Sequence, residues 1–264
     1  MTQAKVSGMF AEDLLQEWKV TSSDQVVLKH PFALGESVGE TLVRDLAAMI
    51  AAPLTALEQV IALDGDDIKA RGWRARFDDH DIRGVTVAVR KGGAVELQMM
   101  LSSFPKTVGW RDEVYRLSEG LIPAELWELP VGTDQSIPEV DPEEKLDPKF
   151  PFEVTDDIVF NSPVLLRPVE GIEDVRTIIS HASAVYGERE YGPRVMSGPH
   201  LLSLWTCGVS GVSIEAANLI QVDSDRRVRE MTLAFRPWPA VQLFRDRVVA
   251  RTRDLIDRSY YTLG

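Results

Sequence analysis

The sequence predicts an α+β fold built from two tandem copies of one unit. A shift of the 264-residue sequence against itself by 132 positions aligns DQVVLKHP (24–31) with DDIVFNSP (156–163). The same shift places Trp73 over Trp205, and tryptophan is poorly interchangeable with other residues. In both copies an extended run and an amphipathic helix precede four strand-like runs, an order typical of α+β proteins.

The first copy contains one extended run at 25–32, after which a helix begins near Gly39. Asp-Gly, Asp-Asp and Gly-Gly turn signals then separate four expected strands near 56–64, 67–77, 82–90 and 94–103. The segment KTVGWRDEVYRLSEG predicts a closing helix.

The second copy repeats this order, with an extended run at 157–166 and a helix that begins near Gly171. Its expected strands lie near 188–196, 200–207, 212–222 and 227–236. The segment PAVQLFRDRVVARTRDLIDRSYY predicts the second closing helix.

The segment between the copies is rich in proline and charged residues and has almost no apolar periodicity, which is typical of a linker. We therefore expect a first domain at 1–130, an acidic Pro-rich linker at 131–150 and a second domain at 151–264.

The strand-like runs carry apolar residues on both faces. Leu201, Trp205 and Cys207 share one face of a strand, whereas Leu202 and Leu204 lie on the other. A sheet with one face in water would alternate apolar and polar residues. We therefore expect one face beneath the helices of its own copy and the other against the second sheet, as in a dimer formed within one chain.

Charge and composition exclude several classes of protein. The formal net charge of -12, with no cluster of Lys or Arg, repels phosphate backbones and argues against a nucleic-acid partner. No apolar run approaches the roughly 18 residues that a membrane span needs, and the N-terminal segment lacks the apolar core of a signal peptide. We therefore expect a cytoplasmic protein with no membrane partner.

Neither a metal nor a cofactor is expected. The single cysteine, Cys207, and the four dispersed histidines do not have metal-ligand spacing. The sequence contains no Walker loop, GxGxxG, HExxH or GxSxG motif.

Two segments of the second copy carry a family resemblance. IVFNSPVLLRPVEGIEDVRTIISHAS and IEAANLIQVDSDRRVREMTLAFRPWPAVQLF resemble a SnoaL-like (polyketide cyclase-like) domain of the nuclear transport factor 2-like superfamily. The resemblance implies cone-shaped α+β barrels with an apolar cavity, usually paired sheet to sheet. The chain departs from the family in its helical hairpin before the first strand, which is shortened to GMFAEDLLQEW in copy one.

The resemblance also implies a kind of site, because enzymes of this superfamily use a cavity base beside a hydrogen-bond donor. The expected catalytic residues are His181, on the inner helix, and Asn218, which interrupts the apolar run AANLI. The expected ligand-binding residues are Tyr186, Tyr191, Trp205 and His30. Further polar candidates are Glu58, Arg74, His80, Gln98 and His200.

Two functions are consistent with these residues. The first is binding of a small lipophilic, carbonyl-containing molecule in an apolar cavity, with isomerase, cyclase or dehydratase activity if a base faces that cavity. The second is a non-catalytic structural or protein-interaction module whose cavities are filled by side chains. We expect a monomer with an internal pseudo-dimer, or a dimer of that monomer.

Overall fold

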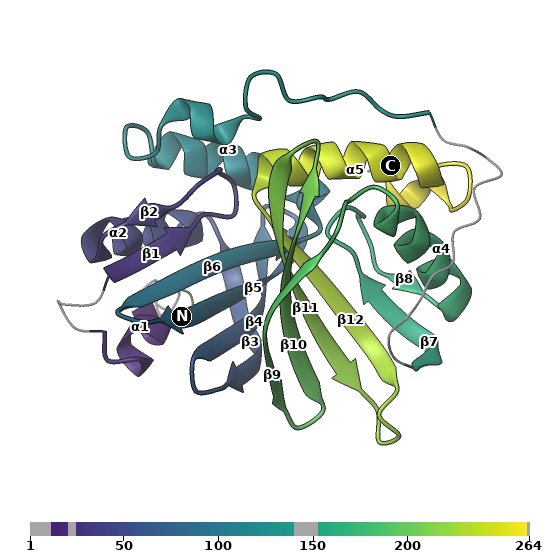
Figure 1. The fold of residues 1–264 in the computed structure, drawn as a ribbon, viewed down its shortest axis with the longest axis horizontal. Coiled ribbons are helices and arrows are strands. Elements are labelled where there is room, and N and C mark those ends of the chain that lie inside the picture. The colour runs from purple at the N-terminus through teal and green to yellow at the C-terminus, as the bar shows by residue number, and fades with distance from the viewer. Residues whose placement is uncertain (1–11, 21–24, 140–152, 263–264) are drawn as a thin grey trace.

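The computed structural model describes residues 12–20, 25–139 and 153–262 (Figure 1). The first half contains α1 (Glu12–Glu17), β1 (Gln25–Lys29), β2 (Ser37–Val38), α2 (Glu40–Ala51), β3 (Thr55–Asp64), β4 (Ile68–Phe77), β5 (His80–Lys91), β6 (Ala94–Ser102) and α3 (Val108–Leu117). The second half contains β7 (Val154–Asn161), β8 (Val169–Glu170), α4 (Ile172–Ser183), β9 (Glu190–Ser197), β10 (His200–Val209), β11 (Val212–Val222), β12 (Val228–Arg236) and α5 (Trp238–Thr252). Short 3-10 turns lie at Phe104–Lys106, Ala124–Trp127 and Arg258–Tyr260. The predicted α+β class is confirmed.

The junction between the first strand and the first long helix is the same in both halves. Gly39 precedes α2 with φ 114°, and Gly171 precedes α4 with φ 88°, a backbone region that side chains disfavour. The N–H of Gly39 donates to the carbonyl of Val26, and that of Gly171 to the carbonyl of Ile158, each at 2.9 Å. The glycines that the sequence shift aligned therefore occupy matching positions.

The described strands form one twelve-stranded sheet, whose main path runs β3-β4-β5-β6-β12-β11-β10-β9. The two halves join where Leu101 of β6 pairs with Phe235 of β12. β1 pairs with β6, and β7 pairs with β12, both in parallel, a feature that the sequence did not predict.

The long sheet curls so that its two ends approach each other (Figure 1). A Cβ atom at Gly65, in the β3–β4 turn, would lie 3.2 Å from a methyl group of Val195 on β9. The sheet therefore has a face that the two halves share and a face that the helices cover.

Each face carries a buried apolar core. The larger core lies under the helices and includes Trp73, Trp110, Trp205, Phe235 and Phe244. The smaller core lies between the halves and contains Leu63, Ile68, Ala70, Val85, Val87, Val89, Met100, Val195, Leu202, Leu204, Ala217, Leu219 and Ala234. Burial of this second set stabilises the contact between the two halves.

Two reciprocal hydrogen bonds also connect the halves. The N–H of Phe104 in the first half donates to the carbonyl of Pro163 in the second at 2.7 Å. The N–H of Trp238 in the second half donates to the carbonyl of Pro31 in the first at 2.9 Å. Each bond joins the segment after the last strand of one half to the segment after the first strand of the other.

A few boundaries differ from those expected. β7 begins at Val154, before the predicted 157, and α5 ends at Thr252, well before 261. Asp257 accepts a hydrogen bond from the N–H of Ser259 at 2.8 Å, and this local bond favours a turn over continued helix. Much of the expected linker, at 140–150, and the first four residues of GMFAEDLLQEW lie outside the described residues.

Candidate functional site

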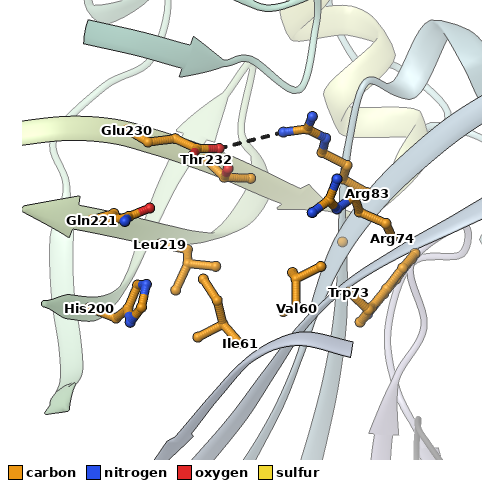
Figure 2. A pocket seen from close by; sticks show the side chains of 12 residues that line it. Val60, Ile61, Trp73, Arg74, Arg83, His200, Leu219, Gln221, Glu230 and Thr232 are labelled. Carbon is orange, nitrogen blue, oxygen red and sulfur yellow. Dashed lines mark ion pairs between the residues drawn. The ribbon is translucent and has the colours of Figure 1, made fainter. Parts of the chain in front are cut away.

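Two grooves lie between the halves, at opposite ends of their shared core. The first groove has a volume of about 290 Å³ (Figure 2). It is lined by Val60, Ile61, Gly72, Trp73, Arg74, Arg83, Gly84, His200, Leu219, Gln221, Glu230 and Thr232. These residues come from β3, β4 and β5 of the first half and from β10, β11 and β12 of the second.

Two arginines face each other in the first groove. Arg74 on β4 is the direct cross-strand partner of Arg83 on β5. Like charges in directly opposed positions destabilise a sheet. Figure 2 shows both guanidinium groups extending toward β12, the strand that carries Glu230 and Thr232.

Arg83 is partly neutralised by groups from the second half. Its Nη1 donates to Oδ1 of Asn161 at 2.8 Å and lies 3.5 Å from Oε1 of Glu230. The amide of Asn161, which is buried, donates to Glu230 at 2.9 Å and to Thr232 at 3.0 Å. Arg74 forms no comparable ion pair within the described residues, although Glu58 lies opposite it on β3. Arg74 is therefore the less firmly held of the two arginines.

The floor of the first groove is apolar. Val60, Ile61 and Leu219 point toward one another across the groove (Figure 2). Leu219 belongs to the core between the halves, and the indole of Trp73 is buried at the side of the groove. Cationic donors above an apolar floor favour a ligand with one charged end and one lipophilic end.

The second groove, of about 220 Å³, lies at the other end of the shared core. It is lined by Lys29, Val89, Lys91, Gln98, Glu190, Tyr191, Gly192, Pro193, Leu204, Trp205, Thr206, Glu215 and Ala216. On β5, Arg83 and Gly84 line the first groove, and Val89 and Lys91 line the second. The core residues Val85 and Val87 lie between them.

Carboxylates from both halves hold Lys29 in the second groove. Its Nζ lies 3.0 Å from Oε1 of Glu96 and 3.0 Å from Oε1 of Glu215. Burial opposes the charged form, but the two carboxylates raise the pKa of Lys29 above its usual value. Nη1 of Arg236 lies 3.2 Å from Oε2 of Glu215 and extends this network.

Two of the residues that the sequence assigned to a cavity in the second half, Tyr186 and Trp205, lie among packed aromatic rings. Tyr186 is 5.4 Å from Trp205 and 5.7 Å from Phe244, measured between ring centroids. Trp205 and Phe244 both contact Phe235, at 5.6 and 5.5 Å. These rings pack against one another in the larger core.

The two expected catalytic residues lie on different elements of this half. His181 is half-buried in the last turn of α4, and Asn218 is half-buried on β11 between Ser203 and Leu233. Asn218 shares a strand face with Ile214, Ala216 and Ile220, which belong to the core beneath the helices. Their catalytic roles stay predictions.

Tyr191 lies at the edge of that aromatic cluster, opposite Trp205 on the neighbouring strand, and His30 lies in the other half. Tyr191 is 55% exposed on β9, with Arg189 and Arg194 beside its ring. His30 is buried in the first half, where its Nδ1 accepts a hydrogen bond from the N–H of Phe32 at 3.0 Å. Of the expected ligand-binding residues, the second groove brings together only Tyr191 and Trp205.

The site expected from the sequence does not contain several of the groove residues. Arg74 and His200 are only further polar candidates there, and Arg83, Glu230 and Lys29 are not among its candidates. The turn signal at Asp78-Asp79 could have identified the arginine pair, because a hairpin that turns there places Arg74 opposite Arg83.

Two negative findings complete the description. Within the ranges that the structure describes, no group of three or more His, Cys, Asp or Glu side chains could hold a metal ion. None of the described helices is long and apolar enough to cross a membrane.

Comparisons with known proteins gave only structural matches. No protein-family model matches the sequence, and no curated protein matches it. A steroid delta-isomerase from Pseudomonas aeruginosa is similar at 21% identity, over 38% of this chain and 75% of that chain, with a TM-score of 0.37. An uncharacterized protein with a cystatin-like fold from Silicibacter pomeroyi matches at 21% identity, over 37% and 70%, with a TM-score of 0.36.

A putative SnoaL-like polyketide cyclase from Shewanella putrefaciens matches at 15% identity, over 37% of this chain and 71% of that chain, with a TM-score of 0.28. The order of elements in each half is the one that the sequence pattern predicted. These solved structures are similar to this chain in fold alone.

Proposed function

We propose that the protein binds a small lipophilic carboxylate in the first groove. The observation that carries this proposal is the direct opposition of Arg74 and Arg83 above an apolar floor. A carboxylate between the two guanidinium groups would relieve their repulsion. The apolar part of the ligand would then cover Ile61 and Leu219.

The chemistry of arginine supports this class of ligand. The planar guanidinium group presents several N–H donors in a geometry that matches the two oxygens of a carboxylate. Arg83 is already held in place by Asn161, so part of the cost of ordering its side chain is met before a ligand arrives. Arg74 is exposed and free to move onto the ligand.

The proposed ligand is lipophilic and carbonyl-containing, as expected from the sequence. Its proposed site is the first groove, not the cavity of the second half. The ring contacts among Tyr186, Trp205 and Phe244 favour a filled cavity in the second half. That packing supports the structural alternative for this cavity, and we assign no isomerase, cyclase or dehydratase activity to it.

The proposed site depends on the tandem arrangement. We infer that 1–130 and 151–264 are two copies of one unit, joined by 131–150 and paired as in a dimer. The reciprocal bonds from Phe104 to Pro163 and from Trp238 to Pro31 support this inference. The groove then belongs to neither copy alone.

Titration calorimetry with hexanoate and benzoate tests the function, with hexanol and benzamide as uncharged counterparts. We expect the carboxylates to bind and their uncharged counterparts to bind at least about tenfold more weakly. Arg74→Gln should weaken carboxylate binding by about tenfold.

Arg76→Gln is the matched control, because Arg76 is exposed on the same strand but does not line the groove. Equal binding of hexanoate and hexanol, or unchanged binding by Arg74→Gln, would contradict the proposal.

A further inference from the structure

The two grooves are built from equivalent positions of the two halves. Gly72, Trp73 and Arg74 of the first groove lie 132 positions before Leu204, Trp205 and Thr206 of the second. Arg83 and Gly84 correspond in the same way to Glu215 and Ala216, and Val60 and Ile61 correspond to Gly192 and Pro193. This shift is the one that aligned the two copies in the sequence.

The polar network of each groove also occupies matching positions. In the first groove Asn161 joins Arg83 to Glu230. In the second, Lys29 stands at the position of Asn161 and joins Glu215 to Glu96. Glu96 on β6 and Glu230 on β12 also correspond, through a shift of 134 positions. The same shift relates Phe104 to Trp238.

The charges of the two networks differ. The first groove has Arg83 and Arg74, whereas the second has Glu215 and Thr206 at the same positions. In the second groove Lys29 and Lys91 balance Glu190 and Glu215, so the lining side chains have no net charge. A ligand with a net charge gains little from such a lining and loses its own hydration.

We propose that the second groove is a separate ligand site that takes an uncharged polyhydroxylated molecule of the size of a monosaccharide. The site is equivalent to the first groove by position and has diverged from it in charge. Its ligand class therefore differs from the carboxylate proposed for the first groove, and the two proposals stand independently.

The groups available in the second groove match hydroxyl groups. Within the described residues, neither the hydroxyl of Thr206 nor the carboxylate of Glu190 has a hydrogen-bond partner. The amide of Gln98 donates to Glu96 from Nε2, which leaves its carbonyl oxygen to accept from a ligand. A hydroxyl group both donates and accepts hydrogen bonds, so its recognition requires acceptors and donors close together. The second groove provides both.

Tyr191 provides an aromatic surface at the same groove. Its side chain is 55% exposed, although it lies opposite the buried Trp205 across the β9–β10 pair. The pairing shifts by a bulge at this point, between Ser203 and Trp205. Bulges re-aim side chains next to functional sites. The C–H face of a pyranose ring can pack on such an exposed ring.

Titration by ligand-observed NMR with glucose, galactose and mannose tests the proposal, with glucosamine and glucuronate as charged counterparts of glucose. At least one neutral sugar should bind, and glucosamine and glucuronate should bind at least about fivefold more weakly than glucose or not at all. Failure of all three neutral sugars to bind, or preference for a charged sugar, would overturn the proposal.

Variants locate the binding in this groove. Thr206→Val removes the hydroxyl at nearly constant shape, and it should weaken sugar binding by about fivefold, as should Tyr191→Ala. Met196→Ala is the control, since Met196 is exposed on the same strand but does not line the groove. Sugar binding that neither Thr206→Val nor Tyr191→Ala changes would refute the site.

A charge swap provides an independent test. Thr206→Arg introduces the residue of the first groove and should shift the preference from glucose toward glucuronate. Arg74→Gln, at the other end of the shared core, should leave glucose binding unchanged. Loss of glucose binding in Arg74→Gln would mean that the sugar occupies the first groove, and the proposal would fail whatever the outcome for carboxylates.

Discussion

Trp73 and Gly84 face each other across β4 and β5 so closely that no side chain fits between them. A Cβ atom at Gly84 would lie 2.1 Å from Cζ2 of the Trp73 indole. The indole Nε1 donates to Oγ1 of Thr86 at 3.1 Å, which fixes the ring. In the second half Trp205 is paired with Ala216 instead. The small residue opposite each tryptophan therefore sets the depth to which the ring packs.

Gly84→Ala should destabilise the protein, because Trp73 and the strand beneath it must move to admit the methyl group. We expect a loss of about 1 to 3 kcal/mol in the free energy of unfolding, measured by urea denaturation. Gly93→Ala, in an open turn with no atom within 4 Å of the added Cβ, is the control. Equal stability of both variants would contradict this account of the packing.

His30 should make stability depend on pH. Burial, and to a lesser extent the nearby Arg236, lower the pKa of His30 to about 3. The unfolded chain takes up a proton near pH 6.5, whereas the folded chain does so only near pH 3. The stability from the neutral imidazole is therefore complete above pH 6.5 and is lost progressively as the pH falls toward 3.

His30→Asn tests this prediction, because the Asn oxygen can accept the N–H of Phe32 without titrating. Between pH 7.5 and 4.5 the wild type should lose about 2 to 3 kcal/mol more than His30→Asn. Urea denaturation at both pH values measures the difference. Parallel losses in the two proteins would rule out His30 as the titrating group.

Arg236→Leu should weaken the contact between the halves. Arg236 is buried, and its Nε and Nη2 donate to the carbonyls of His30 and Gly35, both at 3.1 Å. Removal of the guanidinium group takes this donor from both carbonyls and leaves Glu215 with Lys29 alone, so we expect a loss of about 3 kcal/mol in denaturation experiments. The exposed Arg253→Leu on the same half should change stability little.

Glu230→Gln should strengthen carboxylate binding in the first groove. The substitution removes the negative charge 3.5 Å from Arg83 but keeps an oxygen that can accept from Asn161. Since Glu230 is partly exposed, we expect only about a two- to fivefold lower dissociation constant for hexanoate. Calorimetry measures the change, and weaker binding would show that Glu230 does not compete with the ligand.

The strands and long helices could be predicted because their signals are local. Turn residues between apolar runs located β4 to within one residue, and the aligned glycines located the starts of α2 and α4. The parallel pairing of β1 with β6 could not be predicted, because it brings together residues about 70 positions apart with no short-range signal.

The candidate site could be predicted only in part, for a similar reason. Arg74 and Arg83 share a hairpin, so their opposition follows from its turn. The position of Asn161 beside Arg83 depends on how the two halves pack, and no periodicity within either half records that packing. The sequence resemblance directed attention to the cavity beneath the helices, where Tyr186, Trp205 and Phe244 pack against one another.

The contact between the halves has a consequence for the behaviour of the protein on dilution. In a dimer of separate chains, apparent stability depends on protein concentration, because dissociation accompanies unfolding. Here Phe104 and Pro163, and likewise Trp238 and Pro31, belong to one chain and meet at a fixed effective concentration. Both grooves therefore persist at any dilution, and each substitution changes one groove without imposing the same change on the other.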